Sequence, residues 1–133
     1  MPEKATLDRA RAALRKGKSA SAAAGEFVRE EMHHIREGKH GAASSKQAIA
    51  IGLSKARRAG VPLPPPKPGT VEERTRRSLQ RAYEVGQGLR KARTPSKSRS
   101  KASLQALKRK PRRAASKRAL SRQAKSAAAR RAA

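Results

Sequence analysis

Several residue types are nearly absent from this chain of 133 residues. It has no cysteine and no tryptophan, and only one phenylalanine and one tyrosine. The lack of cysteine excludes disulfides and thiolate metal sites, and it fits a reducing compartment. So few aromatic side chains bury too little apolar area to offset the entropy of ordering the whole chain. We therefore expect a packed core in only part of it.

Long apolar runs are missing as well. No stretch approaches the ~18 apolar residues that a membrane span needs, and the basic N-terminus lacks the apolar core of ~7–15 residues found in secretory signals. Glu3 and Asp8 also disfavour an organellar transit peptide. We expect a cytoplasmic protein that does not insert into membranes.

Acidic residues are scarce throughout and vanish toward the C-terminus. Lys and Arg number 35 against 9 Asp and Glu, which gives a net charge of +26, and no acid follows Glu84. Such charge opposes compaction unless a polyanion is present. Residues 95–133 have almost no apolar anchor, so we predict a disordered, Lys/Arg/Ala-rich tail. Because alanine favours helices, 102–110 and 114–131 are expected to become helical once phosphates neutralise the charge.

What the chain does contain is a cluster of large apolar side chains between Gly25 and Gly60. An apolar stripe at helical spacing predicts a first helix that ends at Gly38; it consists of Ala24, Val28, Met32 and Ile35. Ser44 followed by Gln47 is a capping-box pattern and predicts the start of a second helix, which ends at Gly60. We predict a helical hairpin core over residues 21–60.

We predict helices and a linker on either side of this core. A basic helix capped by Thr6 is predicted in residues 1–20. The five prolines within 61–69 predict an extended spacer, with docking into an aromatic-lined groove as the alternative. Thr70 and Glu73 form a second capping box, so a basic helix is predicted within 70–94. The predicted fold class is all-α: a small helical hairpin core with flanking helices and the disordered tail 95–133.

The histidines do not predict a metal site. His33 and His34 are adjacent, so they point about 100° apart on a helix, and only His40 could add a third imidazole. We interpret all three as exposed polar residues that gain charge below pH ~6.5.

Nothing in the sequence predicts an enzyme. The neighbouring carboxylates Glu30 and Glu31, and likewise Glu72 and Glu73, diverge on a helix and pair more readily with nearby arginines. No nucleophile–base pair, phosphate-binding glycine loop or zinc spacing is visible. We predict no catalytic residue and no cofactor.

The basic tail predicts nucleic-acid binding, because dense Lys and Arg neutralise phosphates and release condensed counterions. Membrane binding would require more bulky apolar residues than Leu104, Leu107 and Leu120. One Tyr and one Phe do not make a stacking platform for single strands, so duplex backbone binding is favoured. The predicted phosphate-binding residues are Lys46, Lys55, Arg57, Arg58, Arg90, Lys91, Arg93, Lys97, Arg99, Lys101, Lys108, Arg109, Lys110, Arg112, Arg113, Lys117, Arg118, Arg122, Lys125, Arg130 and Arg131.

The hairpin also permits a helix-turn-helix interpretation, with 44–58 as the recognition helix. Ser44, Ser45, Lys46 and Gln47 at its N-terminus are suited to contact phosphates or base edges. The intervening GKHGAAS is longer than the usual turn of three or four residues, so sequence-specific recognition is the weaker interpretation.

The segment KQAIAIGLSKARRAG, within a match spanning about residues 25–69, resembles a group of small basic bacterial proteins that carry a domain of unknown function. The resemblance implies no chemistry. From Thr94 onward the composition resembles the tails of linker histones and bacterial histone-like proteins.

These observations favour a non-enzymatic, nucleoid-associated protein that binds DNA largely independently of sequence, with possible partner binding or self-association through its core. One alternative is an RNA- or ribosome-associated basic protein. Another is a partner-binding module with a localising tail.

Overall fold

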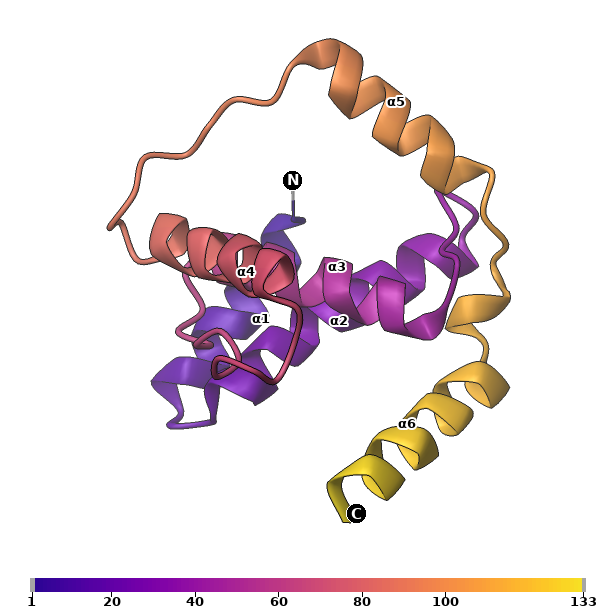
Figure 1. Cartoon of the computed structure of the whole chain (residues 1–133), viewed down its shortest axis with the longest axis horizontal. Helices are drawn as coiled ribbons and strands as arrows, with labels where there is room; N and C mark the ends of the chain where they lie inside the picture. Colours follow the sequence, from indigo (N-terminus) through magenta and orange to yellow (C-terminus); the bar gives the residue numbers. More distant parts are fainter. Residues whose placement is uncertain (1, 133) are drawn as a thin grey trace. The chain divides into compact units, whose positions relative to one another are not determined.

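A computed structural model describes residues 2–132 and is shown in Figure 1. These residues form helices and no strand, which confirms the predicted all-α class. The elements are α1 (Lys4–Arg15), α2 (Ala20–Arg36), α3 (Ser45–Arg58), α4 (Glu73–Gly86), α5 (Lys97–Lys108), the 3₁₀ turn η1 (Arg113–Ala115) and α6 (Lys117–Ala132).

The chain divides into two compact units. The first contains residues 1–30 and 51–93, and the second contains 31–50 and 94–133. Helices α2 and α3 each contribute residues to both units.

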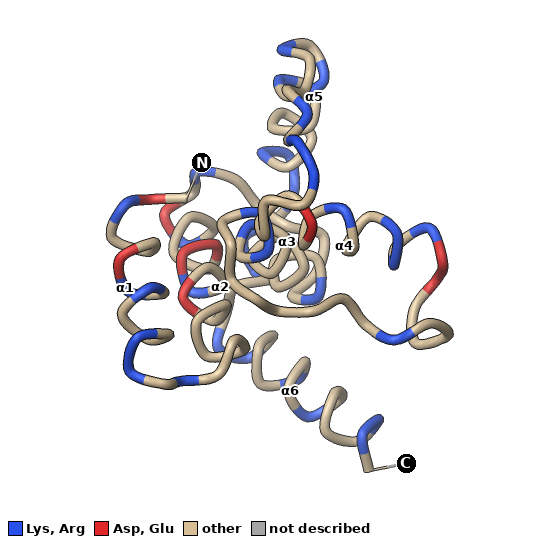
Figure 2. The backbone as a smooth tube through the Cα atoms, turned by 90° about the vertical axis from the view of Figure 1, so that its left-hand side faces the viewer, with Lys and Arg blue, Asp and Glu red and all other residues tan. Residues whose placement is uncertain are grey.

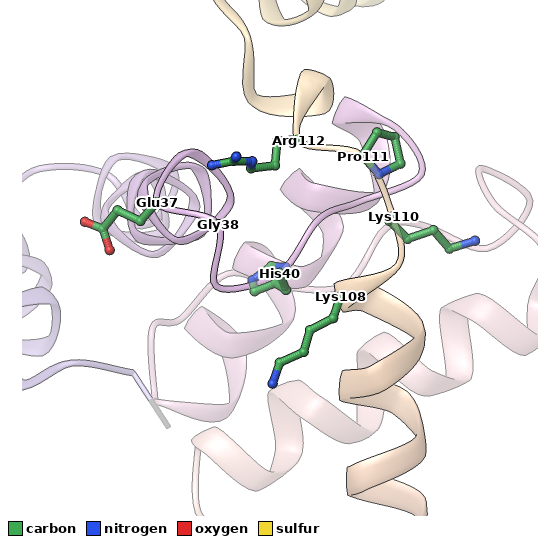
Figure 3. A pocket seen from close by; sticks show the side chains of 7 residues that line it. All are labelled: Glu37, Gly38, His40, Lys108, Lys110, Pro111 and Arg112. Atoms are coloured by element: carbon green, nitrogen blue, oxygen red, sulfur yellow. The ribbon is translucent and has the colours of Figure 1, made fainter.

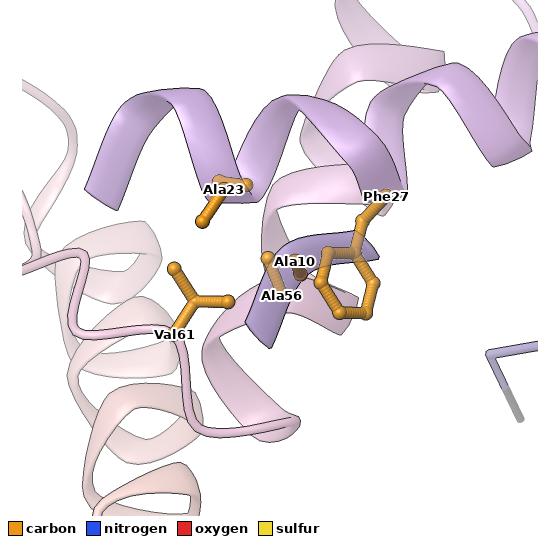
Figure 4. Close-up of a cluster of buried hydrophobic side chains, with 6 residues drawn as sticks. Ala10, Ala23, Phe27, Ala56 and Val61 are labelled. Carbon is orange, nitrogen blue, oxygen red and sulfur yellow. The ribbon is translucent and has the colours of Figure 1, made fainter. Parts of the chain in front are cut away.

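The core of the first unit is small and rich in alanine (Figure 4). Phe27 is the only large side chain at its centre, and its buried neighbours are Ala10, Ala23, Ala24, Ala56 and Val61. Small side chains let helices approach closely, and Gly52 of α3 lies at one such approach to α2. A Cβ atom added there would lie 2.7 Å from the Cα of Val28. Helices α2 and α3 therefore contact each other at a position that has no room for a side chain.

Several predicted helix ends are confirmed. Gly38 ends α2 with a positive φ of 82°, in the left-handed region that favours glycine. At the start of α3 the Ser44 hydroxyl accepts a hydrogen bond from the backbone N–H of Gln47 (3.2 Å). The Gln47 side chain accepts one from the N–H of Ala43 (2.6 Å). Ala24, Met32 and Ile35 of the predicted stripe are buried.

Two predicted helix starts are wrong. Thr6 does not cap α1, which begins at Lys4; its buried hydroxyl donates instead to the Glu30 carboxylate (3.0 Å). Helix α4 begins at Glu73 rather than Thr70. The Glu73 carboxylate accepts hydrogen bonds from Arg76 (2.8 and 2.9 Å), so it does not cap the helix as a capping box requires.

The proline-rich segment 61–69 is free of helix, as predicted, but it is not a bare spacer. Val61 is 4% exposed within the first core, and Leu63 packs partly buried against it. The Arg57 guanidinium donates hydrogen bonds to the carbonyls of Leu63 (3.1 Å) and Pro64 (3.3 Å). The segment is thus docked on its own unit.

The predicted disorder of residues 95–133 is not what the structure shows. Helices α5 and α6 occupy much of this tail, and the hydroxyls of Ser96 and Ser116 cap their N-termini. The tail has few apolar side chains, but its alanines favour helix without a neutralising polyanion. Ala114 and Ala115 of η1 are also buried, which anchors the segment between the two helices.

Candidate nucleic-acid interface

The second unit holds its basic tail by the tail's own backbone carbonyls. The N–H of Gly41 donates to the carbonyl of Leu107 (2.8 Å), and the N–H of Ala42 donates to that of Pro111 (3.1 Å). The Ser45 hydroxyl donates to the Ala114 carbonyl (2.6 Å). Carbonyls of the tail make these three attachments, and of its cationic side chains Arg112 adds a further hydrogen bond, to the carbonyl of Arg36.

Glycine is required where the loop between α2 and α3 meets the tail. A Cβ atom on Gly41 would lie 2.0 Å from the carbonyl oxygen of Lys110, and that oxygen belongs to rigid backbone. The loop and the segment 107–111 therefore touch backbone to backbone.

A pocket of about 500 Å³ lies at this meeting point (Figure 3). Arg112 points toward Gly38, where its Nη1 donates to the carbonyl of Arg36 (3.3 Å), whereas Lys110 points away. The full lining is Glu37, Gly38, His40, Lys108, Lys110, Pro111 and Arg112. The lining thus carries three Lys or Arg side chains and one acid, Glu37.

The tail contains no acidic residue that would offset its positive charge. Figure 2 shows Lys and Arg along α5 and α6, with neither Asp nor Glu on these helices. Within residues 2–132, no acid forms an ion pair with any Lys or Arg from Lys91 to Arg131. Arg90 is different, because its Nε lies 2.8 Å from Glu84 and lowers the pKa of that carboxyl by hydrogen bonding.

Most of the residues predicted to bind phosphate are accessible. All of them are exposed except Lys55, which is half-buried, and Arg57, which is 5% exposed. The structure does not favour Arg57 as a phosphate ligand, because its guanidinium donates to carbonyls of the proline segment. Burial also lowers the pKa of Arg57 below its ordinary value. The sequence pattern did not reveal this role, since Arg57 sits among other basic residues.

One accessible basic surface, on the predicted basic helix, was not among the residues predicted to bind phosphate. Arg74, Arg77 and Arg81 line a second pocket on α4, of about 450 Å³, together with Glu73 and Ser78. Their spacing of three and four residues is a helical-face signal that the sequence contains. Arg77 lies 3.4 Å from Glu73, whose pKa falls to about 2, chiefly because Arg76 donates a hydrogen bond to it. The acid stays ionised and offsets part of this positive charge.

The residues that would make α3 a recognition helix are engaged within the protein. The Ser44 hydroxyl caps the helix and the Ser45 hydroxyl binds the tail. Gln47 accepts from the backbone N–H of Ala43, and of the four residues Ser44 and Lys46 are exposed. Base recognition by this helix end would require these bonds to break.

The interpretation of the histidines as three exposed residues is wrong in part. His33 is exposed, but the His40 side chain is 9% exposed and its Nε2 lies 3.2 Å from Oε2 of Glu31. The rings of His34 and His40 lie 6.3 Å apart, nearly perpendicular. The loop after Gly38 brings His40 back to α2, which sequence spacing did not indicate.

Residues 15–67 match the family described as "Family of unknown function (DUF6496)". This confirms the resemblance to a domain of unknown function over that segment. No curated protein and no solved structure matches the chain. Within residues 2–132, no helix is both long and apolar enough to cross a membrane.

Proposed function

We propose that this protein binds duplex nucleic acid, DNA in preference to RNA, through phosphate contacts that are largely independent of sequence. The observation that carries the proposal is the run of exposed cations from Lys91 to Arg131, none of which is paired with an acid in the part of the chain that the structure describes. Dense, unpaired Lys and Arg displace the counterions condensed on a duplex, and this release supplies the affinity.

The way the tail is attached supports this function. Carbonyls of Leu107, Pro111, Ala114 and Ala115 accept the hydrogen bonds that hold the tail to its unit. The Lys and Arg side chains of α5 and α6 can therefore contact phosphates while the tail remains attached to its unit. A tail already helical in the free protein also loses less conformational entropy on binding than a disordered one.

A preference for duplexes over unpaired strands is supported by what the described surface lacks. Phe27 is 1% exposed in the first core, so among the Phe, Tyr and Trp side chains of residues 2–132 Tyr83 is the one that is partly accessible. A single half-buried ring does not form a stacking platform for unpaired bases. Binding through duplex phosphates needs no such ring.

A salt titration of matched charge variants tests the proposal. One variant is Lys108→Gln/Arg109→Gln/Lys110→Gln, whose side chains are exposed and make no hydrogen bond within the described chain. The matched control is Arg11→Gln/Arg15→Gln/Lys16→Gln in and just after α1, which removes the same three charges. We expect the first variant to reduce the slope of log affinity against log salt by up to about 2.7 on duplex DNA. The control should change it far less.

The same titration on two unrelated DNA duplexes and a matched RNA hairpin separates the alternatives. Equal affinity for both duplexes supports sequence-independent binding, whereas a preference of more than ~1–3 kcal/mol would indicate specific base contacts. Equal slope changes in both triple variants would contradict a role for the tail. Much tighter binding to the RNA would favour an RNA-associated protein instead.

A further inference from the structure

We propose that Glu31, His34 and His40 form a binding site for one divalent transition-metal ion, with zinc the best-suited species. The site belongs to the second unit and is independent of the proposed binding of nucleic acid. Its three ligand atoms, one from each residue, all lie within 4.8 Å of one another. Two imidazoles and one carboxylate are a donor set that zinc uses, whereas magnesium and calcium prefer oxygen ligands alone.

The backbone places the three side chains together. Glu31 and His34 are three residues apart on α2 and therefore share one face of the helix. His40 returns to that face after the left-handed turn at Gly38. The Glu31 side chain is fully buried and that of His40 is 9% exposed, so the ligands are largely shielded from water.

The distances suit a small tetrahedral ion. Nε2 of His40 and Oε2 of Glu31 are 3.2 Å apart. Two ligands bonded at ~2.0–2.1 Å to one tetrahedral zinc lie about 3.4 Å from each other. The two imidazole rings are 6.3 Å apart, and binding would draw them to about 5 Å by rotation of the side chains.

The hydrogen bond of His40 fixes which nitrogen faces the site. Its Nδ1 lies 2.9 Å from the carbonyl oxygen of Gly41. A carbonyl only accepts, so Nδ1–H is the donor. In the neutral ring, Nε2 then carries the lone pair that faces the Glu31 carboxylate. A lone pair and a carboxylate repel unless the ring takes up a proton or a metal ion lies between them, and an Nδ1–H bonded to a carbonyl is the usual outer support of a metal-bound histidine.

The loop that carries His40 is held in place. Gly41 and Ala42 donate backbone hydrogen bonds to the carbonyls of Leu107 (2.8 Å) and Pro111 (3.1 Å). His40 also lines the cationic pocket described above. A metal ion would therefore tie α2 to the loop that borders that pocket.

Calorimetric titration of tag-free, full-length protein with zinc in a phosphate-free buffer tests the site. We expect one ion per chain and a rise in the melting temperature with zinc. His34→Ala and His40→Ala should each weaken binding by more than ~100-fold, because a direct ligand contributes more than the ~10–100-fold of an outer-shell partner. His33→Ala is the matched control, since it removes an exposed neighbouring imidazole, and it should leave the affinity unchanged.

The proposal is overturned if zinc does not bind, if both variants retain binding, or if the His33 variant loses as much affinity as they do. An ion pair between His40 and Glu31 would then account for the contact. If circular dichroism shows that a variant has lost helicity, ¹⁵N NMR of the unmodified protein with and without zinc tests the site instead. Zinc should shift the imidazole resonances of His34 and His40 and leave those of His33 in place. Equal shifts at all three, or none, would refute the site.

Discussion

The Ser45 hydroxyl donates a 2.6 Å hydrogen bond to the backbone carbonyl of Ala114, a residue 69 positions later in the chain. Both residues are buried, at 7% and 4% exposure, so water does not readily replace the bond. Nε of Arg36 donates to the next carbonyl, that of Ala115 (2.9 Å). These bonds fix η1, from whose end α6 begins, so the order of the basic tail depends on residues of α2 and α3.

Replacement of Ser45 by alanine should therefore loosen the tail. The buried carbonyl of Ala114 would lose its donor, which costs roughly 1–3 kcal/mol. Hydrogen exchange should show faster exchange of the amides of Ala115 and Ser116, which close the 3₁₀ turn. Ser121→Ala, at an exposed position of α6, is the control and should change stability by less than ~0.5 kcal/mol. Equal effects of the two substitutions would contradict this account.

The helical fold of the centre could be predicted from the sequence because its signals are local. The stripe from Ala24 to Ile35, the glycine after it and the Ser44 cap all act within one or two helical turns. The ordered tail could not be predicted in this way. Its attachment uses backbone carbonyls and two buried alanines, which a count of apolar side chains does not register.

The sequence indicated the kind of residue that makes up the candidate interface, but not which of these residues are accessible. Charge alone identified the exposed cations of the tail, and the same criterion also included the buried Arg57. Only tertiary contacts distinguish a buried guanidinium bound to carbonyls from an exposed one. The proximity of His40 to Glu31 was missed because it depends on the path of the loop between α2 and α3. The Glu-x-x-His spacing of Glu31 and His34 was the available signal.

Gly52 should not tolerate a side chain, whereas Gly25 should. A Cβ atom at Gly52 would lie 2.7 Å from the Cα and 2.9 Å from the N of Val28, so Gly52→Ala must push the two helices apart. Overpacking of this kind costs typically ~1–3 kcal/mol. Gly25 lies within α2 with open space around it, so Gly25→Ala should stabilise by ~0.5–1 kcal/mol through helix propensity. Urea unfolding of both variants measures the opposite signs; the same sign in both would refute the packing argument.

Arg57 and Arg58 are adjacent but should behave in opposite ways. Arg57→Gln removes a charged donor from the carbonyls of Leu63 and Pro64, which should destabilise the protein by roughly 2 kcal/mol. Its effect on the salt slope of DNA binding should be negligible, because the side chain is buried. Arg58→Gln should leave stability within ~0.5 kcal/mol and reduce that slope by up to about 0.9. Unfolding curves and salt titrations of both variants provide the comparison, and a slope change on loss of Arg57 would show that it reaches phosphate.

Acid should weaken α4 through Glu73. The hydrogen bond from Arg76, with a smaller contribution from Arg77, lowers the pKa of this carboxyl from 4.5 to about 2. A carboxyl whose pKa is lowered on folding stabilises the folded state above its unfolded pKa. That contribution is lost as the pH falls from about 4.5 toward 2, so the helicity of α4 should decline in this range.

Carbon NMR titration of the Glu73 carboxyl measures this directly. The midpoint should lie near pH 2 in the unmodified protein and should move upward in Arg76→Gln, which removes the principal hydrogen-bond donor. Arg74→Gln is the matched control, because it removes one charge from the same helix without breaking a bond to Glu73. An equal upward shift in the two variants would mean that the overall charge of α4, rather than the hydrogen bond from Arg76, keeps Glu73 ionised. A midpoint already at the ordinary value in the unmodified protein would show that Arg76 does not hold the carboxylate in solution.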